Sequence, residues 1–150
     1  MLPRFLPLLA LGLMAATGLS AAEPAAATYE AVTIPTVKTS IYIGSVTLSA
    51  PAFARTGNVY SSTYTAKVFP FFFESEKGRI SITITDDDLA KLAKGEVVEF
   101  KGEGWNEDGE LRRVEGKATP DDAASGKLKV RILVSHRIEL IFNTTYRFGK

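Results

Sequence analysis

The sequence lacks cysteine altogether, holds one histidine and one tryptophan, and carries almost no net charge. Without cysteine there is no disulfide scaffold, thiol nucleophile, iron–sulfur site or cysteine-ligated zinc. Its 18 basic and 17 acidic residues give a net charge of +1, which argues against a dedicated nucleic-acid binder, because such proteins normally carry a marked basic excess. The 150 residues suffice for one domain with its own core.

One uncharged apolar run stands at the start of the chain. Arg4 precedes about 15 uncharged residues, Phe5 to Leu19, and small residues follow. This pattern is typical of a secretory signal peptide, and the run is short for a membrane-spanning helix, which needs about 20 residues. We predict a signal peptide over residues 1–22, cleaved after Ala22 or alternatively after Ala27, and no transmembrane segment in the mature chain. Export without cysteine favours a bacterial periplasm or bacterial secretion.

The rest of the chain is dominated by strand-forming residues that alternate with period two. We predict strands over residues 41–48, 59–68, 79–85, 96–104, 110–118, 127–134 and 138–148. About seven strands separated by turn residues indicate an all-β fold, either an antiparallel β-sandwich or a small β-barrel. We interpret residues 23–36 as a flexible lead-in that could include a first edge strand, and residues 37–150 as a single β domain.

The segment from Asp86 to Lys94 is predicted to form one short α-helix. Thr85 or Asp86 can cap its start, the aspartates at 86–88 suit the positive end of the helix dipole, and Gly95 suits the position after its end. An apolar stripe of Leu89, Leu92 and Ala93 is expected to lie on the sheet. An aspartate triplet also suggests calcium, but this one lacks the alternating oxygen ligands and the distant glutamate of an EF-hand. We therefore assign these acids to capping.

Charge and polarity predict the register of two hairpins. A three-residue turn over 107–109, with Gly109 left-handed, pairs residues whose numbers sum to 216. One face then carries Val98, Phe100, Gly102, Val114, Gly116 and Ala118. The other face carries three opposite-charge pairs, Glu99 with Lys117, Lys101 with Glu115 and Glu103 with Arg113, which indicates a solvated face. A second hairpin is predicted to turn around His136, pairing Val134 with Ile138.

No constellation of residues points to catalysis or to a cofactor. The single histidine, His136, falls at a predicted loop tip without an acidic residue to orient it. No ligand spacing indicates a metal, and no glycine-rich phosphate loop is present. Carboxylates such as Glu74, Glu76 and Glu139 are plentiful, but abundance alone does not indicate a hydrolase. We predict a protein that is not an enzyme, with no cofactor and no metal; a hydrolase with two facing carboxylates is the third hypothesis.

The aromatic block Phe69-Pro70-Phe71-Phe72-Phe73 is the most unusual local feature. Pro70 cannot donate in a β-ladder, so it marks an edge, a bulge or a bend. One interpretation is a strand buried on both faces. The other is an aromatic pocket or partner surface. Trp105 and Leu111, which the hairpin register pairs at the end of the charged face, are a second candidate contact.

Two resemblances concern the layout of the chain. The alternation ending in Tyr146-Arg147-Phe148 resembles the last strand of outer-membrane β-barrels, although that pattern ends on the aromatic residue and Gly149 and Lys150 follow here. The charged ladder over 99–117 would also have to line a lumen. In size and strand-rich layout the chain is similar to exported β-barrels that hold polyisoprenoid-type lipids, without a motif specific to them.

The leading functional hypothesis is an exported, non-catalytic binding or interaction module. Its candidate contact residues for an unknown protein or ligand are Phe69, Phe71, Phe72, Phe73, Trp105 and Leu111. The alternative is a carrier that holds an apolar, lipid-like small molecule inside a barrel, which requires a cavity of roughly 300 Å³ or more. Charge is also uneven, because residues 128–150 carry a net +4. This excess could serve sheet packing, association of copies, or contact with anionic lipid heads or wall polymers.

Overall fold

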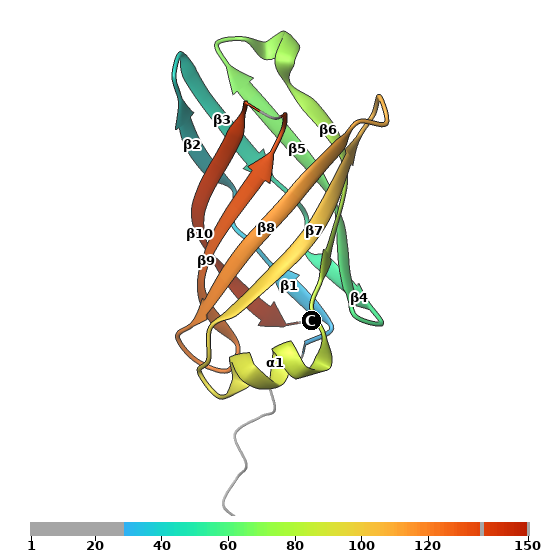
Figure 1. The fold of residues 1–150 in the computed structure, drawn as a ribbon, viewed down its shortest axis with the longest axis vertical. Coiled ribbons are helices and arrows are strands. Elements are labelled where there is room, and N and C mark those ends of the chain that lie inside the picture. The colour runs from blue at the N-terminus through green and yellow to red at the C-terminus, as the bar shows by residue number, and fades with distance from the viewer. Residues whose placement is uncertain (1–28, 136, 150) are drawn as a thin grey trace, which may run out of the picture.

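The chain folds into a closed antiparallel β-barrel of eight strands with one short helix at one end (Figure 1). This computed structural model describes residues 29–135 and 137–149. Two of the barrel strands are each broken in two, so ten segments appear in the chain. They are β1 (Ala31–Thr33), β2 (Val37–Ile41), β3 (Gly44–Ser49), β4 (Phe53–Thr56), β5 (Val59–Phe69), β6 (Glu76–Thr83), β7 (Val98–Asn106), β8 (Leu111–Pro120), β9 (Ser125–Leu133) and β10 (Glu139–Gly149).

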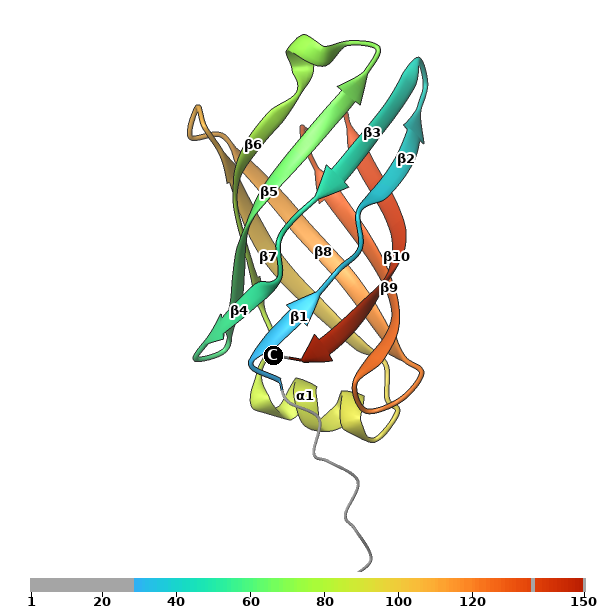
Figure 2. The same cartoon turned by 180° about the vertical axis from the view of Figure 1, so that it is seen from behind.

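The strands follow one another around the barrel in chain order. From β5 to β10 each strand pairs with the next, and the barrel closes because β1 pairs with both β10 and β4. Strand β5 pairs with β3 over Thr65–Phe69 and with β4 over Val59–Ser61. Strand β2 pairs with β3 alone, so its other edge runs beside β10 without a β-ladder (Figure 2).

Prolines lie at both strand breaks. Pro35 lies between β1 and β2, and Pro51 lies between β3 and β4. Proline has no N–H to donate, so a continuous ladder cannot pass through either position. The Ser62 hydroxyl donates to the Pro51 carbonyl at 2.9 Å. The β2–β3 hairpin is therefore joined to the rest of the sheet through β3 only.

Period-two alternation fills the barrel with one face of every strand. The buried side chains include Val46, Tyr64, Ile80, Ile82, Val98, Phe100, Val114, Leu128, Val130, Ile132, Phe142 and Phe148. Facing strands interdigitate large and small residues. The Phe100 ring lies over Gly116, its cross-strand partner, where a Cβ would collide with the ring. This packing sets the interior dimensions of the barrel.

Helix α1 (Asp86–Ala93) covers one end of the barrel (Figure 1). The Thr85 hydroxyl accepts from the Asp88 N–H, and the Asp88 carboxylate accepts from the Thr85 N–H, so the predicted cap is confirmed as a capping box. Leu89 and Leu92 are buried against the barrel. Ala93, expected in the same stripe, is exposed, because the helix turns it away from the barrel. Gly95 has a positive φ of 85° after the helix end.

Both predicted hairpin registers are confirmed. Strands β7 and β8 pair with residue numbers that sum to 216, and Gly109 is left-handed with φ 76°. Strands β9 and β10 pair as predicted, with Phe142 opposite Val130. His136 itself lies outside the described residues. The three opposite-charge pairs on β7 and β8 face each other in register, but in the described ranges none forms an ion pair within 4.0 Å.

Three sequence predictions need comment. The strand predicted over residues 41–48 is wrong in its first half, because the chain reverses at Tyr42 and Ile43 between β2 and β3. Strand β1 is not an edge strand, since barrel closure gives it a partner on each side. The predicted signal peptide and both cleavage sites lie outside the described residues.

Two buried tyrosines give a matched pair of stability predictions. The Tyr60 hydroxyl donates to the Tyr29 carbonyl at 2.6 Å, whereas the Tyr146 hydroxyl has no partner among the described residues. Burial raises the pKa of each to about 12. We expect Tyr60→Phe to lower the free energy of unfolding by about 1 kcal/mol and Tyr146→Phe to leave it unchanged or raise it. Urea denaturation at pH 7 measures both; a larger loss for Tyr146→Phe would contradict this packing.

Candidate functional site

Exposed apolar side chains gather at the end of the barrel opposite α1. Three connections meet there: β2–β3, β5–β6 and β9–β10 (Figure 1). Phe73 is 80 % exposed and Phe72 is 63 % exposed. We define the apolar rim as Tyr42, Ile43, Phe69, Phe72, Phe73 and Ile138, all of which are exposed. Exposed apolar groups concentrated in this way mark interaction sites more often than scattered ones do.

The β5–β6 connection holds its phenylalanines in a fixed arrangement. After Pro70 ends β5, a 3-10 turn over Phe72–Glu74 follows, and the Ser75 hydroxyl accepts from the Val68 N–H at 2.9 Å. Two edge-to-face ring pairs form, Phe69 with Phe72 at 5.8 Å and Phe71 with Phe73 at 5.9 Å between ring centroids. Such pairs add about 0.5–1.5 kcal/mol beyond area burial. These rings are ordered before any partner arrives.

The β2–β3 turn lies directly beside this aromatic connection. Ser45 pairs with Phe69 across β3 and β5. A Cβ at Gly44 would collide with the Phe69 carbonyl, so only glycine allows the turn to approach so closely. This contact brings Tyr42 and Ile43 next to the Phe69 side of the rim.

Trp105 and Leu111 form a separate exposed contact. They pair across β7 and β8 on the outer face of the barrel, as the register predicts, and Arg79 of β6 is the other partner of Trp105. Trp105 is 48 % exposed and Leu111 is partly buried. The interpretation in which another loop covers them does not fit this exposure. The structure does not join this pair to the apolar rim.

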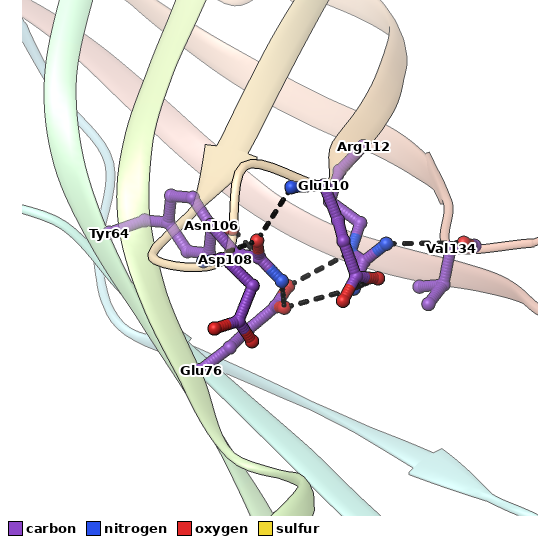
Figure 3. Close-up of polar contacts among 7 residues, drawn as sticks. All are labelled: Tyr64, Glu76, Asn106, Asp108, Glu110, Arg112 and Val134. Atoms are coloured by element: carbon purple, nitrogen blue, oxygen red, sulfur yellow. Dashed lines mark hydrogen bonds and ion pairs between the residues drawn. The ribbon is translucent and has the colours of Figure 1, made fainter.

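A charged cluster lies inside the barrel below the rim (Figure 3). Arg112 forms a two-pronged contact with Glu76, Nε to Oε1 and Nη2 to Oε2, both at 3.1 Å. The Tyr64 hydroxyl and the Asn106 amide also donate to this carboxylate, at 3.2 and 2.9 Å. Arg112 further reaches Glu110 and the Val134 carbonyl. The carboxylate of Glu76 is thus hydrogen-bonded on both oxygens.

The electrostatics of the cluster favour a permanent ion pair. Burial by itself raises the pKa of Glu76, but the hydrogen bonds from Arg112 and Asn106 outweigh it and hold that pKa below its usual value. The same contacts raise the pKa of Arg112. With every oxygen engaged, Glu76 is placed to cross-link β6, β7 and β8 rather than to accept a substrate proton.

Sequence reasoning missed Tyr42, Ile43, Ile138 and the inner pair. Tyr42 and Ile43 were assigned to a strand, since β-formers surround them without a proline or a typical turn dipeptide. The inner pair did carry a signal. In the predicted register Arg112 falls opposite Gly104 on the apolar face, and Glu76 shares the alternation of Ile80 and Ile82. Two opposite charges at inward positions indicate partners.

The barrel interior offers little room for a ligand. Three apolar cavities inside it measure about 30–40 Å³ each. A drug-sized molecule requires roughly 300 Å³ or more. Among residues 29–135 and 137–149, no group of three histidine, aspartate or glutamate side chains could hold a metal ion.

Comparisons with family models, with curated proteins and with solved structures gave no match. In the part of the chain that the structure describes, no helix is long and apolar enough to cross a membrane. The candidate site therefore rests on geometry alone, and that geometry singles out the apolar rim.

Proposed function

We propose that this chain is an exported, non-catalytic binding module that docks onto a protein partner through the apolar rim. The observation that carries the proposal is the concentration of ordered, exposed aromatic groups at the end opposite α1. Rigid aromatic side chains lose little conformational entropy on binding and are enriched in interface hot spots.

A protein partner suits the charges around the rim better than an anionic membrane does. Exposed Lys67, Lys77 and Arg137 are interspersed with exposed Glu74 and Glu139. Such a mixed border provides no net attraction to anionic lipid headgroups. It does match the usual interface pattern of an apolar centre with a polar surround.

The test is site-specific photo-crosslinking in an exporting bacterium. A crosslinking residue at position 73 is expected to capture a discrete protein, while one at position 90 on α1, at the other end of the barrel, does not. With the purified pair, F72S/F73S is expected to weaken binding at least tenfold, which corresponds to about 1.4 kcal/mol. The matched variant V97S/I141S, which alters two exposed apolar residues away from the rim, is expected to stay within twofold.

The rim variant also predicts a stability result. Because Phe72 and Phe73 are exposed, F72S/F73S should change the free energy of unfolding by less than about 1 kcal/mol in urea denaturation. Equal crosslinking from both positions, or binding only to vesicles in a manner that depends on Phe72 and Phe73, would contradict a protein-docking rim.

The carrier of an apolar small molecule remains a second candidate because of one observation. The β2–β3 hairpin lacks a ladder to β10, and an apolar cavity beside this seam is lined by Val37 and Leu48 on one side and Phe142 on the other. Outward movement of the hairpin would enlarge that cavity. The carrier requires this opening, whereas the docking rim requires no rearrangement.

A further inference from the structure

Three lysines lie together on the outer wall of the barrel, away from the apolar rim. Lys127 and Lys129 are two residues apart on β9 and point to the same face, and Lys117 on β8 is directly opposite Lys129. Like charges placed directly opposite across strands are destabilising. The sequence retains this cost although both strands alternate with ample polar choices elsewhere.

The surroundings leave these charges without counter-charges. Lys129 has Lys117 and Asn143 as its two cross-strand neighbours, and Lys127 has Thr119 and Thr145. Within 29–135 and 137–149, none of the three lysines lies within 4.0 Å of a carboxylate. Glu99, opposite Lys117, is the nearest acid in these rows. Farther along β9, by contrast, Arg131 is paired with Glu139.

The wall is hollowed where the lysines meet. A depression of about 530 Å³ is lined by Lys117, Thr119, Lys127, Leu128, Lys129, Asn143, Thr144 and Thr145. It therefore offers three ammonium groups together with hydroxyl and amide groups that can also donate to an anion. We call this depression the lysine groove.

We propose that the lysine groove binds a linear polyanion that carries repeated phosphate or sulfate groups. Residues two apart on a strand are separated by about 6.6 Å, and cross-strand neighbours by about 5 Å. A single small anion cannot reach all three ammonium groups closely, whereas a chain with anions at this spacing can. The groove is distinct from the apolar rim, so this site stands or fails independently of the protein-docking function.

The experiment is a binding titration of the mature chain with fluorescent linear polyphosphate and with dextran sulfate, at 50 and 200 mM NaCl. K117Q/K127Q/K129Q is expected to weaken binding at least tenfold at low salt and to flatten its salt dependence. The matched variant K38Q/K91Q/K94Q removes the same charge at exposed positions elsewhere and is expected to stay within twofold.

Each arm of the titration bears on the proposal. Preference for one polymer over the other identifies phosphate or sulfate as the recognised group. Equal weakening by both triple variants would overturn the groove, because binding would then follow net charge alone. Absence of binding to either polymer at 50 mM NaCl, or inorganic phosphate competing as well as polyphosphate per phosphate, would overturn a polymer site. Binding only to vesicles of phosphatidylglycerol would also overturn it.

Discussion

Glu76→Ala is expected to lower the free energy of unfolding by about 3 kcal/mol in urea denaturation at pH 7. Removal of one partner leaves the largely buried guanidinium of Arg112 without its main counter-charge, and such losses typically cost about 3–5 kcal/mol. Glu76 is 23 % exposed, which places the effect at the lower end of that range. Tyr64 and Asn106 also lose an acceptor.

Two controls separate the ion pair from the mere presence of a charge. The double variant E76L/R112M removes both charges and is expected to stay within about 1 kcal/mol of the wild type, because a buried ion pair contributes little against an apolar replacement. Glu74→Ala, two residues away and exposed, should change stability by less than about 0.5 kcal/mol. If E76A and E76L/R112M are equally destabilised, the pair does not act as a unit.

The pH dependence of stability follows from the lowered pKa of Glu76. Its carboxylate contributes stability above the pKa of the unfolded chain, about 4.3, and that contribution is lost as the pH falls through the lower folded pKa. The stability difference between wild type and Glu76→Gln should therefore narrow between pH 7 and pH 3. A difference that widens on acidification would contradict the ion pair.

Phe142→Ala is expected to cost about 3–5 kcal/mol, the range for deleting a buried phenylalanine. Phe142 is 1 % exposed and lines two of the interior cavities, so its removal would merge them into one larger void. Ile141→Ala, the adjacent outward residue, should change stability by less than about 1 kcal/mol. A loss below about 1.5 kcal/mol for Phe142→Ala would show that the interior is not packed around this ring.

The parts of the fold that were predictable are those in which two independent signals agree. The β7–β8 register was accessible because only one pairing puts Val98, Phe100 and Val114 on one face and opposite charges on the other. The helix at 86–93 combined a cap, an acidic first turn and a terminal glycine. The barrel rather than the sandwich was not accessible, since closure depends on the long-range pairing of β1 with β10.

The candidate site was predicted in part. The phenylalanine block was visible in the sequence, but alternation alone could not decide whether it is buried; Pro70 and the 3-10 turn expose it. Tyr42 and Ile43 were hidden because a hairpin reversal between strand-forming residues leaves no composition signal. Their place beside Phe69 results from the close approach at Gly44, a tertiary contact that the local sequence does not encode.

The central claim is that this barrel acts through its apolar rim and not through its interior. The most direct test is native mass spectrometry of the chain from Glu23 to Lys150, purified without detergent from the periplasm of an expressing bacterium. The docking rim predicts a discrete complex with a second protein, which F72S/F73S dissolves and V97S/I141S preserves. An adduct of a few hundred daltons that survives F72S/F73S and is lost on denaturation would contradict it and establish the barrel as a carrier.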